Sequence, residues 1–480
     1  MNKKSKKIKE LKETLFLTNR YGGDMFYPPA VLWKKNISIK QAKETWQKAA
    51  NDVISGKVSS DLPGLYVHIP FCQSKCFYCN CVSVSAADNE LHGSYLDCLE
   101  KEIKALALPH AWPIKTFCVG GGTPTILSEG NLEKMLGMMA KFFNFSQCEQ
   151  AMMEASPGTI SPAKIRIFKD FGIDKITLGV QTLDENLLAK MNRQQDKKMV
   201  WSAFEQLRKE KIKYINIDLM AGLPGQTINS FLATLKEVLT LKPDTIHLNP
   251  FTPLFFTPFA LGGNKLRTKD LAARLEMIKQ GFELIRQIHP WALEREGLEK
   301  ENQQLFNTAN FNSSVLGLGW GALSHAFSRL QYGKDNFIEN YQNINQGLKK
   351  YIRTLGKGGW PLFFGCSLSK EEEMRVYLIR AFESGGMVKK NSFQNIFQEN
   401  PFDIFPREFA ELEKIGVIEE NNGNLRLRAK SRLDLFVFSR VFFSSKAAGE
   451  IKKIIKRKKF DLGNIDEKLE INFCNELILN

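Results

Sequence analysis

Four of the nine cysteines in this 480-residue chain lie within ten residues of one another, in the segment HIPFCQSKCFYCNC (68–81). Three of them, Cys72, Cys76 and Cys79, have the spacing C-x3-C-x2-C. Three thiolates in one tight loop can hold three corners of a [4Fe-4S] cluster. The missing fourth protein ligand leaves one iron open for a substrate or cofactor. The spacing therefore predicts a cluster that takes part in chemistry.

A structural zinc ion is the alternative for the same segment, because Cys81 or His68 could complete a set of four ligands. Such zinc sites usually use paired knuckles separated by a longer loop, and no second knuckle follows here. We expect His68 to be a packed, hydrogen-bonded residue beside the loop rather than a ligand. The other cysteines are scattered, and an odd total without a signal peptide favours reduced thiols and a cytoplasmic location.

Polar residues at predicted strand ends form a second group of candidates. Glu154 follows an apolar run, where a carboxylate suits a ligand ammonium or ribose hydroxyl, or is simply an exposed strand end. Asp218 lies inside apolar INIDLM and would be costly to bury unpaired, so it needs a ribose or a salt bridge to Arg193. Gln181 is neutral and suits either a sugar or a carboxylate. The glycines of GGGTP (120–124) allow close approach of a ligand, or form a plain tight turn.

The elements that must position these residues alternate between β-rich and helical patterns. Helices are predicted in SYLDCLEKEIKALA and NLEKMLGMMAKFF, between strands. This alternation implies a parallel sheet with helices outside, and functional residues gather at the carboxyl ends of such strands. The predicted strands are 65–69, 116–120, 151–156, 175–181, 214–220 and 245–251.

The two ends of the chain differ from this central part. Residues 1–60 are predicted to be a polar helical segment, and residues 336–480 a mostly helical, winged-helix-like domain with a basic tail and a turn at NNGN. Residues 61–335 would then form the α/β domain. Most of the net charge of +15 comes from lysines at the two ends, which we interpret as solvated tails or helix faces. We expect no nucleic-acid partner, no secretory signal and no integral membrane span.

Together, these segments resemble the radical S-adenosylmethionine (SAM) enzymes, and among them the oxygen-independent coproporphyrinogen III oxidases. The resemblance covers most of residues 65–443 and depends on the order and intervals of its motifs. These are LYVHIPFC, the aromatic before the last cluster cysteine, the additional C-x-C cysteine, GGGTPTIL, Glu154 in MEASPGT, GVQT followed by Arg193, INIDLMAGLPGQT, LGLGWGALS and LRLRAKSRLDLFVFSRVFF.

The resemblance implies an α/β fold: a partial (β/α)6 TIM-like radical SAM barrel with the N-terminal and C-terminal parts described above. It also implies a [4Fe-4S] cluster on Cys72, Cys76 and Cys79, and two SAM molecules. Contacts to the SAM on the cluster would come from Tyr66, Gly121, Glu154 and Leu323. Contacts to the second SAM would come from Tyr78, Gly122, Thr123, Gln181, Arg193, Asp218 and Thr252. The family has a small apolar residue in place of Thr252, so that contact would be through the backbone.

The implied reaction is oxidative decarboxylation of two propionates of coproporphyrinogen III to vinyl groups, which gives protoporphyrinogen IX in haem biosynthesis. Reduction of the cluster cleaves SAM to methionine and a 5′-deoxyadenosyl radical, which removes a hydrogen atom from the propionate. Loss of carbon dioxide and one electron leaves the vinyl group. Cys81 is expected to lie near this radical chemistry as a catalytic residue. The implied partners are the tetrapyrrole and a reduced donor such as flavodoxin or ferredoxin, and a monomer is expected.

Two alternatives share the cysteine triad. Haem chaperones resemble these oxidases but typically lack the C-x-C cysteine and the long N-terminal segment, whereas this chain has Cys81 and residues 1–60. Its segment NRYGGDMFYPPA (19–30) also keeps a version of the Arg-Tyr and Tyr-Pro pairs of the oxidases. Other radical SAM reactions on tetrapyrroles, such as methyl transfer or anaerobic haem degradation, often involve relatives with an aromatic in place of Cys81.

Overall fold

The computed structural model describes the greater part of the chain, including nearly all of the predicted α/β domain up to residue 289. The described residues are 27–28, 32–54, 62–251, 257–264, 268–289, 314–327, 329–333, 344–361, 363–428 and 432–457. Three residues singled out in the sequence, Arg20, Tyr21 and Thr252, lie outside them. In the described part, no helix combines the length and the hydropathy needed to cross a membrane.

An eleven-stranded sheet forms the centre of the protein, in the order β1-β15-β14-β13-β12-β2-β6-β8-β9-β10-β11. All six predicted strands are present, and each pairs in parallel with its neighbour. Because β11 ends the row of strands, the barrel is partial, as expected. The six strands are β2 (Gly64–Ile69), β6 (Thr116–Gly121), β8 (Gln150–Ala155), β9 (Lys175–Gln181), β10 (Tyr214–Ala221) and β11 (Thr245–Pro250).

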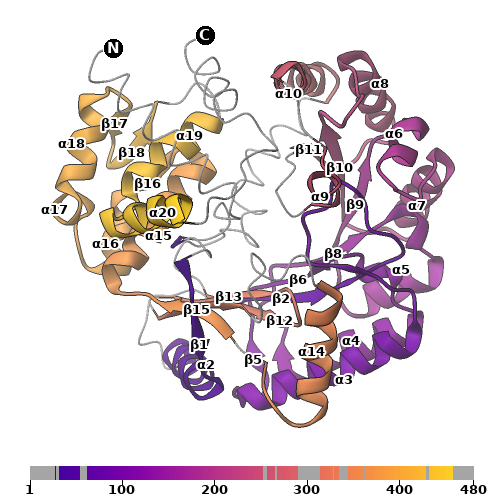
Figure 1. Ribbon diagram of the computed structural model, residues 1–480, viewed down its shortest axis with the longest axis horizontal. Helices are drawn as coiled ribbons and strands as arrows, with labels where there is room; N and C mark the ends of the chain where they lie inside the picture. Colours follow the sequence, from indigo (N-terminus) through magenta and orange to yellow (C-terminus); the bar gives the residue numbers. More distant parts are fainter. Residues whose placement is uncertain are drawn as a thin grey trace.

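Helices cover the outer side of these strands (Figure 1). The first six begin after an Asp, Ser or Thr whose side-chain oxygen accepts a hydrogen bond from an amide of the first turn. This capping satisfies amides that have no partner within the helix, so each start is encoded locally. The helices are α3 (Asn89–Leu106), α4 (Glu129–Phe142), α5 (Pro162–Asp170), α6 (Glu185–Lys190), α7 (Lys197–Lys209), α8 (Ile228–Leu239) and α10 (Thr268–Ile288).

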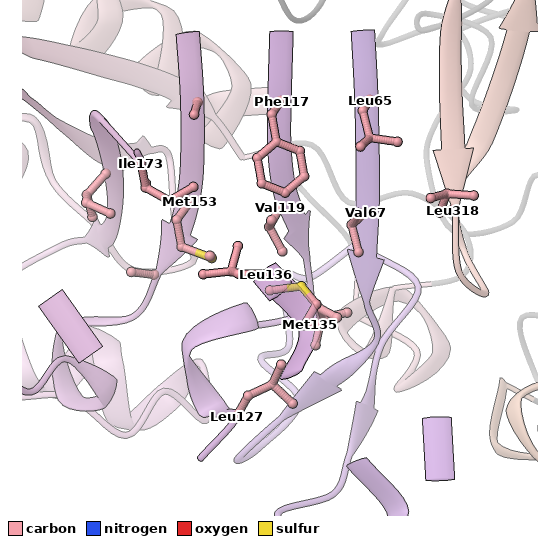
Figure 2. Close-up of a cluster of buried hydrophobic side chains, with 14 of the residues drawn as sticks. Leu65, Val67, Phe117, Val119, Leu127, Met135, Leu136, Met153, Ile173 and Leu318 are labelled. Atoms are coloured by element: carbon pink, nitrogen blue, oxygen red, sulfur yellow. The ribbon is translucent and has the colours of Figure 1, made fainter. Parts of the chain in front are cut away.

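Alternation along the strands separates the core from the barrel interior. Leu65, Val67, Phe117 and Val119 face the helices and pack with side chains such as Met135 of α4 (Figure 2). The residues between them have the opposite parity and face the concave side. This second set contains Tyr66, His68, Cys118, Glu154, Thr177, Gln181, Asn216, Asp218 and His247. The hydrophobic pattern that builds the core therefore also directs a column of polar side chains inward.

The sheet continues beyond the barrel through β12, which pairs in parallel with β2, and then through antiparallel strands from distant parts of the chain. Helix α2 (Ile39–Ile54) confirms the amphipathic N-terminal helix, but the N-terminal segment also contributes a strand, which the sequence analysis did not predict. That strand is stabilised by pairing with β15, so local sequence alone does not specify it. The additional strands are β12 (Val315–Leu318), β13 (Leu323–Ala326), β14 (Leu330–Gly333), β15 (Phe363–Ser367) and β1 (Lys34–Ile37).

The C-terminal part has its own hydrophobic core and a three-stranded sheet in the order β16-β18-β17. Its predicted helices are present, and the hairpin turns at NNGN as expected. Helix α14 (Ile344–Gly356) instead packs beside α3, and its Leu348, Tyr351 and Leu355 belong to the barrel core (Figure 1). The elements of the C-terminal part are α15 (Lys370–Gly385), β16 (Met387–Lys389), α16 (Lys390–Phe397), α17 (Pro401–Ile404), α18 (Pro406–Lys414), β17 (Ile418–Asn421), β18 (Asn424–Leu427), α19 (Arg432–Ser439) and α20 (Ser445–Arg457). The division at 60/61 and 335/336 remains a proposal, and the large sheet crosses both boundaries through β1 and β15.

A glycine-rich turn between β12 and β13 packs against the end of β2. Gly319 has a φ of +88°, and a Cβ there would lie 2.3 Å from the Tyr95 hydroxyl and 2.7 Å from the His68 carbonyl oxygen. The Tyr95 hydroxyl donates to the His68 carbonyl at 2.7 Å and accepts from the Trp320 amide at 2.9 Å. Any side chain at position 319 would therefore break the contact between this turn and β2.

We predict that Gly319→Ala destabilises the protein strongly, whereas Gly358→Ala has only a small effect. Gly358 also has a positive φ (+74°), but a Cβ there meets nothing within 4 Å. The control measures backbone strain alone, about 1–2 kcal/mol, and Gly319→Ala adds overpacking of about 1–3 kcal/mol. Thermal unfolding followed by circular dichroism compares the two. Equal shifts in midpoint would show that the close packing of this turn contributes nothing.

Candidate functional site

A cavity of about 560 Å³ opens at the carboxyl ends of the barrel strands. Twelve of the fifteen predicted site residues line it: Cys72, Cys76, Tyr78, Cys79, Cys81, Gly121, Gly122, Thr123, Glu154, Gln181, Arg193 and Asp218. Tyr66 and Leu323 lie behind this lining, on β2 and β13, and Thr252 lies outside the described residues. The topology thus brings together residues that are up to 146 positions apart in the chain, from Cys72 to Asp218.

The cysteine loop (residues 70–86) starts and ends in a short parallel pair, β3 (Phe71–Cys72) and β4 (Val84–Ser85). The amide of Ala86 donates to the Cys72 carbonyl at 3.0 Å and closes its base. Cys72 is buried, Cys76 and Cys79 are half-buried, and Cys81 is exposed. The remaining short elements are β5 (Trp112–Pro113), β7 (Phe143–Asn144) and α9 (Pro258–Leu261).

The segment that follows α6 holds the outer part of this loop. The Phe77 amide donates to the Met191 carbonyl at 3.0 Å. The Asn192 side chain donates to the Lys75 carbonyl at 3.0 Å, and the Ser74 hydroxyl donates to the Asn192 carbonyl at 3.2 Å. An irregular loop cannot satisfy its own backbone groups, so these bonds from outside it define its path.

Arg193 extends the same contact into the site. Its Nη1 donates to the Tyr78 hydroxyl at 3.0 Å and lies 3.8 Å from the Cys76 sulfur, and its Nη2 donates to the Gly179 carbonyl. Arg193 therefore connects the end of β9 to the cysteine loop through two residues of that loop. The salt bridge to Asp218 considered from the sequence is replaced by these contacts.

The thiols have the chemistry of a ligand set. The pKa of Cys79 is lowered to about 5, first by a hydrogen bond from Cys81 and then by the charge of Lys75. The Thr123 hydroxyl donates to the Cys72 sulfur at 3.6 Å. A thiolate and donors directed at sulfur fit an iron–sulfur cluster.

His68 is engaged elsewhere, as predicted. Its Nε2 lies 2.7 Å from the Val82 carbonyl oxygen, which can only accept, so Nε2 carries the proton. In the neutral ring Nδ1 then accepts from the Tyr66 hydroxyl at 3.1 Å. Both nitrogens have partners within the protein. The zinc alternative therefore has no histidine ligand at this position.

Glu154 ends β8 beside the glycine turn. The Gly121 amide donates to its Oε2 at 3.2 Å, and a Cβ on Gly120 would lie 2.8 Å from its carboxyl carbon. Burial, and next the charge of Asp218, raise the pKa of Glu154 to about 7. Ionisation of the Glu154 carboxyl group is costly in the free protein, and a bound cation would make it favourable. The position of Glu154 therefore suits an ammonium group of a ligand.

Gln181, the last residue of β9, is strained and unsatisfied. Its φ of +68° lies in the left-handed region, which a non-glycine residue rarely adopts. Its Oε1 is buried without a hydrogen-bond partner. Strain together with an unpaired polar atom at a cavity wall is typical of a ligand-binding position. The residues present thus fit a polar ligand next to the cysteine loop.

A polar network on β10 and β11 was not predicted from the sequence. Asp218 Oδ1 accepts a hydrogen bond from the side-chain Nδ2 of Asn216 at 2.8 Å and lies 2.9 Å from His247 Nδ1. The Thr245 hydroxyl donates to Asn216 Oδ1 at 2.8 Å. The signal was available in the alternation of the two strands, because residues 216 and 218, and 245 and 247, share the inward parity. The network satisfies Asp218 without Arg193.

Comparison with known proteins agrees with this geometry. Residues 66–238 match the radical SAM superfamily. The heme chaperone HemW of Bacillus subtilis is 27% identical over 376 residues, which are 77% of this chain and 96% of the relative. The oxygen-independent coproporphyrinogen III oxidase of Salmonella typhimurium is 26% identical over 391 residues, which are 77% of this chain and 82% of the relative.

Among solved structures, the coproporphyrinogen III oxidase HemN from Escherichia coli, a radical SAM enzyme, matches with a TM-score of 0.72. The sequence identity is 21%, and the match covers 88% of this chain and 96% of the oxidase. This likeness establishes the shared fold. The sequence relatives include a chaperone and an oxidase at almost equal identity, so the activity has to be argued from the site.

We predict that replacing Cys72, Cys76 and Cys79 together by alanine abolishes iron binding after anaerobic reconstitution. Iron, sulfide and visible absorbance measure the cluster. Cys148→Ala is the control, because Cys148 is a half-buried thiol whose sulfur donates to the Gln150 carbonyl, away from the loop. Unchanged iron and sulfide in the triple variant would refute the ligand assignment.

We also predict that Glu154→Ala and Arg193→Ala weaken SAM binding while the fold is retained. Loss of a charge-assisted hydrogen bond should cost about 1.5–3 kcal/mol, or roughly a 10- to 150-fold higher Kd. Calorimetry on the reconstituted protein measures the affinity. Glu149→Ala is the control, since this carboxylate pairs with Lys115 outside the cavity. Wild-type affinity in both variants would exclude the two residues from the site.

Proposed function

We propose that residues 66–238, which match the radical SAM superfamily, hold a [4Fe-4S] cluster and SAM, and this premise leads to a proposed activity. We propose that the protein is an oxygen-independent coproporphyrinogen III oxidase, a radical SAM oxidoreductase of haem biosynthesis. It would convert two propionates of coproporphyrinogen III to vinyl groups and form protoporphyrinogen IX.

The observation that carries this proposal is the shared cavity. The three cluster cysteines, the polar strand ends and the exposed thiol of Cys81 all line one space. Cys72, Cys76 and Cys79 would hold the cluster, and Glu154 and Gln181 of the same cavity would contact SAM. Cys81 is then a thiol next to the reacting groups, in the position proposed for a catalytic residue.

When bound, the cluster and SAM supply a radical that removes a hydrogen atom from the propionate side chain. Carbon dioxide then leaves the substrate, and one electron passes to an acceptor as the vinyl group forms. The protein contributes binding and orientation through Arg193, Gln181 and Asp218, and the cavity excludes water from the reacting carbon. Two SAM molecules, as the resemblance implies, would occupy this cavity.

The N-terminal segment supports the oxidase rather than the chaperone. Tyr27 is buried, and its hydroxyl accepts from the Ser444 amide at 2.9 Å. Its carbonyl accepts from the Gln331 side chain at 2.9 Å, and its ring packs on Phe443 at 4.8 Å. This residue belongs to the Tyr-Pro pair that the chain shares with the oxidases. These contacts make Tyr27 an integral part of the fold.

The second candidate is a haem-binding chaperone, which the similarity to HemW favours. A different radical reaction on a tetrapyrrole, such as methyl transfer or anaerobic haem degradation, is the third. For the oxidase we further propose a reduced flavodoxin or ferredoxin as electron donor, a monomer and a cytoplasmic location. These follow from the family resemblance.

The test is anaerobic incubation of the reconstituted protein with SAM, a reductant and coproporphyrinogen III, with tetrapyrroles analysed by mass spectrometry. The oxidase forms protoporphyrinogen IX and one 5′-deoxyadenosine for each vinyl group. A chaperone forms no such product and binds haem in a parallel titration. Haem binding without product would therefore replace the first proposal by the second.

We predict that Cys81→Ala keeps the cluster and SAM binding but loses product formation. Cys81 lies two residues after the last ligand, and it is an exposed residue that lines the cavity. Iron content, SAM cleavage and product are measured on one preparation, with Cys366→Ala on β15 as the control thiol. Full product formation would remove the catalytic role. Loss of the cluster would instead identify Cys81 as a fourth ligand.

A further inference from the structure

The cysteine loop has two halves that are anchored to different parts of the protein. Residues 74–78 are attached to the segment after α6 through Met191, Asn192 and Arg193. Residues 82–86 are attached to β2, because the His68 ring donates to the Val82 carbonyl at 2.7 Å, and to the start of the loop, because Val84 and Ala86 donate to the carbonyls of Pro70 and Cys72. The segment Cys79–Cys81 connects the halves and carries both the last ligand and the additional thiol. A cluster bound by ligands from this loop therefore requires an interaction that keeps the two halves at a fixed distance.

Lys75 makes this connection. It belongs to the first half, and its ammonium Nζ donates to the Cys81 carbonyl at 2.5 Å and to the Ser83 hydroxyl at 2.8 Å. Ser83 is buried, so the ammonium reaches into the loop rather than into solvent. The backbone carbonyl of Lys75 accepts a hydrogen bond from the Asn192 side chain at 3.0 Å, and this bond fixes the backbone from which the Lys75 side chain starts. One residue is thus bonded to both anchored halves.

The charge of Lys75 has no carboxylate partner among the described residues. Lys75 lines the same cavity as Cys72, Cys79 and Cys81, and its positive charge acts on all three thiols. A cluster held by three thiolates becomes more negative when it is reduced. A fixed positive charge nearby stabilises the reduced form more than the oxidised form and so raises the reduction potential.

We propose that Lys75 is a positioning residue that clamps the C-x-C segment of the loop and sets the reduction potential of the cluster bound there. Its ammonium ties Cys81 and Ser83 to the first half of the loop and places one positive charge beside the ligands. The inference rests on the cluster proposed above and is independent of the identity of the tetrapyrrole.

The test uses anaerobically reconstituted protein without SAM and four variants. Lys75→Met removes the charge and keeps the length, Lys75→Arg keeps the charge, and Ser83→Ala removes one partner of the ammonium. Lys169→Met is the control, because Lys169 is an exposed lysine paired with Glu210 at 3.9 Å, away from the loop. Two measurements are made: the midpoint potential of the cluster by electron paramagnetic resonance, and hydrogen exchange of peptides that cover residues 76–86.

We expect Lys75→Met to have a more negative midpoint potential and exchange that is about tenfold faster or more, the factor for losing a hydrogen bond to a charged group. Lys75→Arg should have a potential near that of the wild type. Ser83→Ala should exchange faster but keep its potential, because the charge remains. Lys169→Met should match the wild type in both measurements.

Wild-type potential and exchange in Lys75→Met would overturn the proposal. If Lys75→Met takes up no iron, its midpoint potential cannot be measured, and Ser83→Ala becomes the deciding variant. Wild-type hydrogen exchange in Ser83→Ala would then overturn the proposal. Failure of the wild-type protein to bind iron would contradict the proposed cluster rather than the role of Lys75. In that case the exchange measurement on iron-free protein still tests the clamp.

Discussion

The site depends on holding an irregular cysteine loop in one conformation. A stretch with almost no regular structure loses conformational freedom when it is ordered, and it has no internal ladder of hydrogen bonds to compensate for that loss. Its amides and carbonyls are satisfied by Met191 and Asn192 on one side and by His68 on the other. The thiols are therefore brought together by segments that belong to the barrel, and the conformation of the cysteine loop depends on the strands and helices around it.

The barrel performs two tasks with one sequence pattern. Outward-facing apolar residues build the core with the helices, and the residues between them form the polar interior. The interior is electrostatically demanding: burial raises the pKa of Glu154, and Gln181 has a strained backbone and an unpaired oxygen. Such features lower stability unless a ligand compensates for them, and they occur where the cavity opens. Stability is supplied by the outer face, and binding is concentrated on the inner face.

The strands that extend the barrel sheet connect the two ends of the chain to the barrel. Strands β12 to β15 and β1 continue the barrel sheet, so that segments before and after the barrel become part of it. The buried Trp46 of α2 donates to the Tyr332 hydroxyl at 2.7 Å, and Tyr27 reaches Ser444 in the C-terminal part. The ends of the chain are thereby attached to a sheet whose other end carries the site. The C-terminal core is separate but is linked to the barrel through these contacts.

The sequence by itself determined the six parallel strands, the helical patterns between them and the spacing of Cys72, Cys76 and Cys79, because periodicity and ligand spacing are local properties. It also placed His68 correctly beside the loop. Only the tertiary structure decided that Lys34–Ile37 is a strand, that Asp218 pairs with Asn216 and His247 rather than Arg193, and that Lys75 spans the loop. These features arise from pairing between segments whose separation in space is set by strand order and register, and no local pattern encodes that separation.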